Sequence, residues 1–161
     1  MKQITLMVVA FIFAAQVHAQ TEKYVKAMEA KIAEMGKAST PGAWQELGNA
    51  FQRIGEAEKT QWLPFYYAAV SNVMNGLMQG NGEMGGGNTT QIDQIADRAE
   101  DLINKAEAIE KENSDIYCVR KMINTLRMMA DPMNRYQTYG PKAAEALAKA
   151  KQLDPNNPRV Y

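Results

Sequence analysis

The stretch that decides the fold is Trp44-Gln45-Glu46-Leu47-Gly48-Asn49-Ala50-Phe51. Its large apolar residues recur at spacings of three and four, which places them on one face of a helix. Gly48 lies on that face and lacks a Cβ, so we expect a neighbouring helix to approach closely there. Thr40 and Pro41 precede the stretch as an N-cap and a first helical residue, so the helix should begin at Pro41.

The chain beyond residue 20 has helical periodicity throughout, and no stretch alternates apolar and polar residues as a strand does. The sequence therefore predicts an all-α fold of about six helices. They are expected over residues 22–35, 41–55, 60–78, 90–112, 114–129 and 141–153. The third of these is apolar nearly all round and should be the most buried.

Glycine, proline and capping residues set the expected ends of these helices. Gly55 should end the second helix, while Thr90 and Ser114 should cap the fourth and fifth. The segment Gly80–Asn88 holds five glycines in nine residues, which indicates a loop or crossover. Residues 133–140 are expected to form another loop, ending before Pro141.

The N-terminus has the pattern of an export signal. Lys2 precedes an almost uninterrupted apolar run, Ile4–Ala15, which is too short to span a bilayer. Val17-His18-Ala19 then offers small residues at the positions that signal peptidase reads. Residues 1–19 are therefore predicted to be a signal peptide and residues 20–161 a single domain, with a retained membrane anchor as the alternative. The expected location is the periplasm, with secretion or the cell envelope as alternatives.

Composition narrows the function classes. His18 is the single histidine and leaves with the signal peptide, which argues against histidine-based catalysis and against most transition-metal sites. Of 18 basic and 18 acidic residues only Lys2 precedes the cleavage site, so the remaining charge is close to neutral and suggests neither nucleic-acid nor anionic-membrane binding. Cys118 is the single cysteine and should be a small buried hydrophobe, with a reactive thiol as the alternative. No cofactor and no metal are expected.

A second pattern closes the chain, where small and large apolar residues precede an Asp-Pro pair: Ala143, Leu147, Ala150 and Asp154-Pro155. Together with Trp44, Leu47, Gly48 and Phe51, it resembles the tetratricopeptide-repeat family, in a divergent form. The resemblance spans most of residues 41–155 and implies stacked antiparallel helix hairpins, a short and irregular α-solenoid. Residues 62–69 also resemble a segment of small exported Bacteroidetes proteins of unassigned function.

The C-terminal residues bear on how such an array ends. Arg159-Val160-Tyr161 follow the Asp-Pro turn, where another helix normally begins in this family. An uncapped solenoid leaves an apolar face in water. We therefore expect either that the chain continues in its natural form or that a partner completes the last repeat.

The repeat resemblance implies a binding module with a groove for a peptide or protein partner. By the geometry of that family, nine residues on two helices would face the groove. They are Gln45, Asn49, Gln52, Arg53, Tyr117, Lys121, Asn124, Thr125 and Met128. The alternative is that these side chains belong to ordinary solvated helix faces.

Two further function classes stay open. Asp97 and Asp101 share a helix face at a spacing of four, as a carboxylate pair for acid–base catalysis requires, but nearby cations favour a solvated face. No catalysis is therefore expected. Methionines such as Met122 and Met129 suit adaptable contacts, so a self-associating, homo-oligomeric envelope protein is the alternative to a binding module.

Overall fold

The computed structural model describes residues 22–80 and 87–161, and this part of the chain is a stack of α-helices without strands. A helix over residues 22–35 is followed by α2 (Pro41–Glu58), α3 (Leu63–Gln79), α4 (Thr89–Ile109), α5 (Ser114–Ala130), α6 (Pro132–Leu153) and the short 3-10 helix η1 (Pro158–Val160). The predicted all-α class is confirmed. The predicted signal peptide and most of the glycine-rich loop lie outside the described residues.

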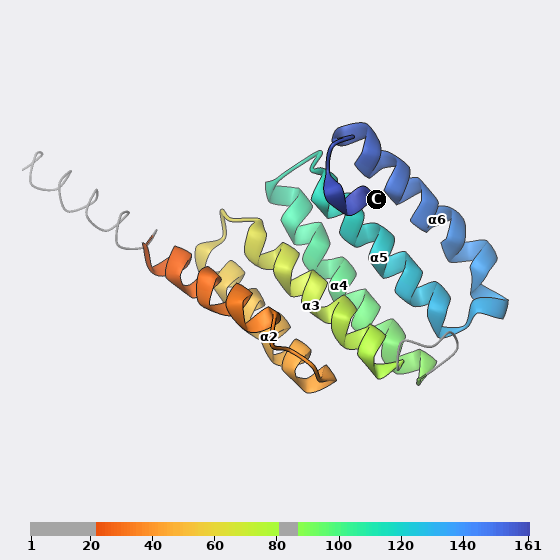
Figure 1. The fold of residues 1–161 in the computed structure, drawn as a ribbon, viewed down its shortest axis with the longest axis horizontal. Helices are drawn as coiled ribbons and strands as arrows, with labels where there is room; N and C mark the ends of the chain where they lie inside the picture. The colour runs from red at the N-terminus through yellow and green to blue at the C-terminus, as the bar shows by residue number, and fades with distance from the viewer. Residues whose placement is uncertain (1–21, 81–86) are drawn as a thin grey trace, which may run out of the picture.

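Consecutive helices run antiparallel and lie side by side in chain order, from α2 to α6 (Figure 1). Each helix from α2 onward packs against the next one, and α3 also contacts α5. The expected stack of helix hairpins is therefore present. Short connections account for this order, because helices joined by few residues fold back on their neighbours.

The core is richest along α3, as the sequence predicted. Ten of its 17 residues are buried. On the α2 side, a Cβ added at Gly48 would stand 2.9 Å from Nδ2 of Asn72, so the close approach expected at this glycine occurs. Phe51 of α2 is fully buried and stacks on Tyr67 of α3 with 5.3 Å between ring centroids. The deciding stretch of sequence thus supplies the interface between α2 and α3.

The helix N-termini follow capping chemistry, although two caps differ from those expected. Thr40 accepts a hydrogen bond from the Ala43 N–H, which confirms the predicted start of α2. The cap of α4 is Asn88 instead of Thr90, and the cap of α5 is Asn113 instead of Ser114. In both, an asparagine lies where its side-chain oxygen reaches a free backbone N–H.

The prediction that Gly55 ends the second helix was wrong. α2 continues to Glu58 and ends at Lys59, which adopts a left-handed conformation with φ 49°. Gly55 instead lies against the ring of Phe65, so its missing side chain serves packing and not helix termination. A glycine permits both roles, and only the position of the neighbouring helix distinguishes them.

The predicted loop at residues 133–140 was also wrong, because α6 begins at Pro132 and continues through Pro141. Asp131 accepts a hydrogen bond from the Asn134 N–H and Pro132 occupies the first turn, so the helix starts there. Pro141 removes the hydrogen bond to the Gln137 carbonyl. Both residues are exposed, so water can hydrogen-bond to that carbonyl.

The C-terminal segment folds back onto the start of α5. Val160 of η1 is buried beside Cys118 and Ala150. Asn157 donates hydrogen bonds to Ser114 Oγ at 2.9 Å and to Asp115 Oδ1 at 2.8 Å. The expected burial of Cys118 is confirmed, and that burial raises the pKa of its thiol, which disfavours a reactive thiolate.

Candidate functional site

A groove of about 560 Å³ crosses the C-terminal half of the stack, where α5 lies between α4 and α6. We call it the α4–α6 groove. Its lining residues are Glu100 from α4; Tyr117, Arg120, Ile123, Asn124 and Arg127 from α5; and Tyr139, Lys142, Glu145, Ala146 and Lys149 from α6. Figure 1 shows these three helices in green, cyan and blue.

Helical periodicity explains why these side chains converge. On α5 the main lining positions are 117, 120, 124 and 127, and on α6 they are 139, 142, 146 and 149. Both sets follow spacings of three, four and three, which place residues on one face of a helix. Each helix therefore presents a continuous stripe to the groove. Tyr139 belongs to the stripe on α6 because this helix extends through residues 133–140.

Arginines of α5 attach the floor of the groove to α4. Arg127 donates to Asp97 at 2.8 Å and to Glu100 at 2.7 Å, and only 8% of Arg127 is exposed. Arg120 donates to Asn104 at 2.8 Å and also bonds Glu107. These charge-assisted bonds hold α5 against α4 and pair each of the two guanidinium groups with a carboxylate.

Two tyrosines supply aromatic surface. Two cations lie near the ring of Tyr139, with Arg127 Cζ 5.9 Å and Lys142 Nζ 5.4 Å from its centroid. Such contacts hold an aromatic ring in place through its negative face. Tyr117 lies on α5, where hydrogen bonding with the Glu107 carboxylate raises the pKa of its phenol. Tyr117 therefore stays protonated at neutral pH.

The structure distributes the nine predicted groove residues over several surfaces. Tyr117 and Asn124 line the α4–α6 groove. Lys121, Thr125 and Met128 of the same helix do not line it, and the Thr125 hydroxyl donates to the Lys121 carbonyl at 2.9 Å.

The α2 members of the predicted set lie elsewhere. Asn49 and Gln52 accept hydrogen bonds from Arg98 of α4, at 2.6 and 2.9 Å, so these two side chains connect α2 to α4. Asn49 and Arg53 also line hollows beside the first helix. Gln45 is exposed and lines none of the hollows described here.

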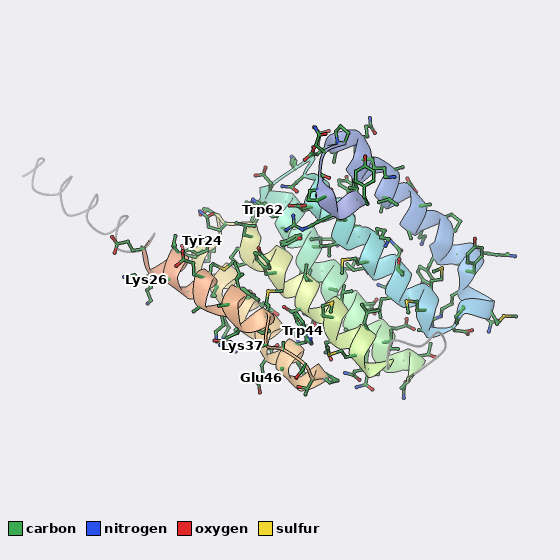
Figure 2. The ribbon with its side chains drawn as sticks, in the orientation of Figure 1. Tyr24, Lys26, Lys37, Trp44, Glu46 and Trp62 are labelled. Atoms are coloured by element: carbon green, nitrogen blue, oxygen red, sulfur yellow. The ribbon has the colours of Figure 1, made fainter. Side chains whose placement is uncertain are left out.

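A second surface follows the hairpin of residues 22–35 and α2. It consists of two hollows of about 450 and 590 Å³, which share Lys31, Ala50 and Arg53. We call it the hairpin groove. Figure 2 shows Lys37 and Glu46 near the end where the two helices join, and Tyr24 near the opposite end. Tyr24 lines the more apolar hollow.

Sequence reasoning missed most of the α4–α6 groove, including Arg120, Arg127, Tyr139, Lys142 and Lys149. Tyr139 was missed because residues 133–140 were predicted to be a loop, whereas Lys142 and Lys149 lie in the predicted helix over residues 141–153 but were not assigned to a groove. The available signal was the spacing of Tyr139, Lys142, Ala146 and Lys149, which is helical on both sides of Pro141.

Over residues 22–80 and 87–161, histidine, cysteine, aspartate and glutamate form no group of three that could hold a metal ion. None of the helices described is both long and apolar enough to cross a membrane.

The fold and its lined grooves define an all-α helix-hairpin protein. A scan against protein-family models found no match, so the tetratricopeptide-repeat assignment stays a prediction. A search of curated proteins found none either. Among solved structures, the chain is similar to the HusA haemophore from Porphyromonas gingivalis, with 30% sequence identity and a TM-score of 0.74. The alignment covers 86% of this chain and 64% of the haemophore, so the chain spans less than two thirds of that protein.

Proposed function

We propose that this chain is an exported binding protein whose α4–α6 groove takes haem or a related tetrapyrrole. The observation that carries the proposal is a groove with two tyrosines and four cationic side chains in a protein that is 30% identical to a haemophore. A tetrapyrrole is a flat aromatic ring with acidic side groups. It therefore matches a lining that combines aromatic and cationic residues.

The size and surface of the groove suit this ligand class. About 560 Å³ lies within the range of roughly 300 to 1,000 Å³ typical of small-molecule sites. Ile123 and Ala146, both largely buried, are the apolar residues of the lining. Flat aromatic contact favours a ring ligand, because offset stacking and edge contacts with tyrosine are both attractive.

Binding without catalysis is part of this proposal. Asp97 of the sequence-derived carboxylate pair bonds Arg127, and Asp101 is exposed. A general base needs a free carboxylate close to a substrate pocket. Asp97 instead serves as an anchor for α5, which supports a structural role. Export rests on the signal-peptide pattern at residues 1–19.

A second candidate function is binding of an extended peptide along the hairpin groove. The continuity of that groove through Lys31, Ala50 and Arg53 favours it, because an extended segment needs a long surface. Asn49 and Arg53, both predicted from the sequence as groove residues, lie on this surface. A peptide there would leave the α4–α6 groove free.

A ligand titration tests the proposed function. Residues 20–161 are titrated with haemin and with metal-free protoporphyrin IX, and binding is followed by porphyrin absorbance and tryptophan fluorescence. We expect saturable one-to-one binding with a Kd of about 1 μM or below, and unchanged affinity in Arg53→Ala. Absence of saturable binding of both compounds would exclude tetrapyrrole binding. Weakened binding in Arg53→Ala would move the site to the hairpin groove.

A further inference from the structure

The groove-facing side of α6 carries two lysines in helical register. Lys142 and Lys149 are seven residues apart, so they lie on one face about two turns or ~10.5 Å apart along the axis. Both side chains line the α4–α6 groove. Their flexible stems allow the two ammonium groups to converge or spread, which suits recognition of two separate anionic groups.

These lysines differ from the arginines around them. Arg120 and Arg127 of the floor, and Arg135 at the start of α6, each form an ion pair with a carboxylate of α4. Lys142 and Lys149 form no ion pair with any residue that the structure describes. The ammonium group of Lys142 instead makes a cation–π contact with the Tyr139 ring. The arginine charges hold helices together, whereas the lysine charges are available to a ligand.

The two carboxylates that line the groove form no ion pair with these lysines. Glu145 lies between the two lysines on the same face of α6 but forms an ion pair with neither. Glu100, the other carboxylate of the lining, is paired with Arg127. The charged residues that α6 contributes to the groove, two lysines and one glutamate, therefore carry a net charge of +1, and both lysines are outside the ion pairs that hold the arginines.

We propose that Lys142 and Lys149 form a carboxylate-recognition pair that selects ligands bearing two carboxylates beside a flat aromatic body. This inference rests on the proposed function, since it places a tetrapyrrole in the α4–α6 groove. The two propionate groups of haem project from one edge of the ring. With that edge toward α6, each propionate meets one lysine while the ring contacts Tyr117 and Tyr139.

The test compares protoporphyrin IX with its dimethyl ester, which keeps the ring and removes both negative charges. Titrations use the unmodified chain, the double variant Lys142→Gln/Lys149→Gln, and Lys26→Gln as a matched control. Lys26 is exposed on the first helix, far from α6 in Figure 2. A third variant, Lys142→Arg/Lys149→Arg, keeps both charges.

We expect the unmodified chain to bind the free acid about tenfold more tightly than the ester, because each partly solvated ion pair contributes a factor of a few. The double glutamine variant should lose this preference, whereas the arginine variant and Lys26→Gln should keep it. The preference should also shrink at high salt.

The outcomes separate the two proposals. Equal affinity for acid and ester in the unmodified chain, or an undiminished preference in the double glutamine variant, overturns the carboxylate-recognition pair and leaves tetrapyrrole binding intact. Failure of the unmodified chain to bind either compound overturns the proposed function and the pair with it.

Discussion

Gly55 of α2 lies directly against Phe65 of α3, so close that a Cβ at residue 55 would stand 2.8 Å from both Cε1 and Cζ of the ring. The ring cannot easily move away, since Phe65 is only 6% exposed and Lys105 Nζ lies 5.7 Å from its centroid on α4. The contact therefore fixes how closely α2 and α3 approach at this end of the hairpin.

Replacing Gly55 by alanine should destabilise the fold. The added methyl group forces the Phe65 ring or the α2 backbone to shift, and overpacking of this kind costs about 1 to 3 kcal/mol. The measurement is urea denaturation followed by circular dichroism, with the free energy of unfolding extrapolated to water.

Gly42→Ala is the matched control on the same helix. Gly42 is exposed, and a Cβ there meets nothing within 4 Å. Alanine has the higher helix propensity, so this variant should be neutral or up to about 1 kcal/mol more stable. Equal effects at positions 42 and 55 would contradict the packing role of Gly55.

Most of the fold could be predicted from the sequence because its signals are local. Trp44–Phe51 carries its own periodicity and its own close-approach glycine, and Thr40 with Pro41 marks the helix start. Each of these features acts within one or two helical turns. The all-α class, the start of α2 and the burial of α3 follow from such signals.

The wrong predictions concern residues whose structural role depends on surroundings that the local sequence does not specify. A glycine such as Gly55 can either end a helix or allow a close contact. Here the contact with Phe65, ten residues further along the chain, gives Gly55 the second role. A proline inside a helix usually breaks it. α6 continues through Pro141 because the Gln137 carbonyl, which loses its hydrogen bond, is on an exposed residue that water can reach. Local rules leave both cases open.

The candidate site was harder to predict than the fold. Tyr117 and Asn124 were assigned to a groove from the repeat resemblance, and they line the α4–α6 groove. Tyr139 required α6 to extend through residues 133–140. Lys142 and Lys149 lie within the predicted last helix, and their place in the groove follows from the packing of α6 against α5. Asn49 was predicted to be a groove residue and lines the hairpin groove, but its hydrogen bond with Arg98, 49 residues away, was not foreseen.

The ion pair between Asp93 and Arg135 should make stability depend on acid pH. Arg135 donates to Asp93 at 2.7 and 2.8 Å, and this hydrogen bonding holds the pKa of Asp93 below its usual value. The stabilisation is therefore present above the unfolded-state pKa near 3.9 and is lost as pH falls through the lower folded-state pKa.

The variant Asp93→Asn tests this dependence. At pH 7 it should lower stability by about 1 kcal/mol, as expected for a partly exposed bidentate pair, and the difference should narrow towards pH 2. Thermal unfolding of both proteins across pH 2 to 7 measures the loss of stability at pH 7 and its change with pH. A destabilisation independent of pH would indicate that Asp93 acts by packing and not by charge.

Tyr139→Ala should weaken tetrapyrrole binding by about fivefold, because an aromatic contact contributes roughly 1 kcal/mol beyond its area. Tyr161→Ala is the control. Tyr161 also contacts a lysine, with Lys151 Nζ 5.1 Å from its centroid, but it lies outside the α4–α6 groove. Isothermal titration calorimetry with protoporphyrin IX measures the affinity of both variants. Equal losses in the two variants would argue against a ring contact at Tyr139.

Tyr66 should make the protein sensitive to alkali. Burial is the main reason that the pKa of its phenol is raised to about 12; the nearby Arg159 guanidinium opposes this rise and the Asp115 carboxylate supports it. Between about pH 10 and 12 the unfolded chain releases this proton while the folded chain retains it. Stability should therefore fall as pH rises through this window.

Tyr66→Phe removes the ionisable group and keeps the buried ring. Its stability should decline less between pH 10 and 12 than that of the unmodified chain, by up to about 2 kcal/mol. Tyr136→Phe provides the comparison, because Tyr136 is 65% exposed and should keep the original alkaline decline. Urea denaturation at pH 8, 10 and 11.5 measures the three slopes. Parallel slopes in all three proteins would mean that other groups cause the alkaline loss of stability.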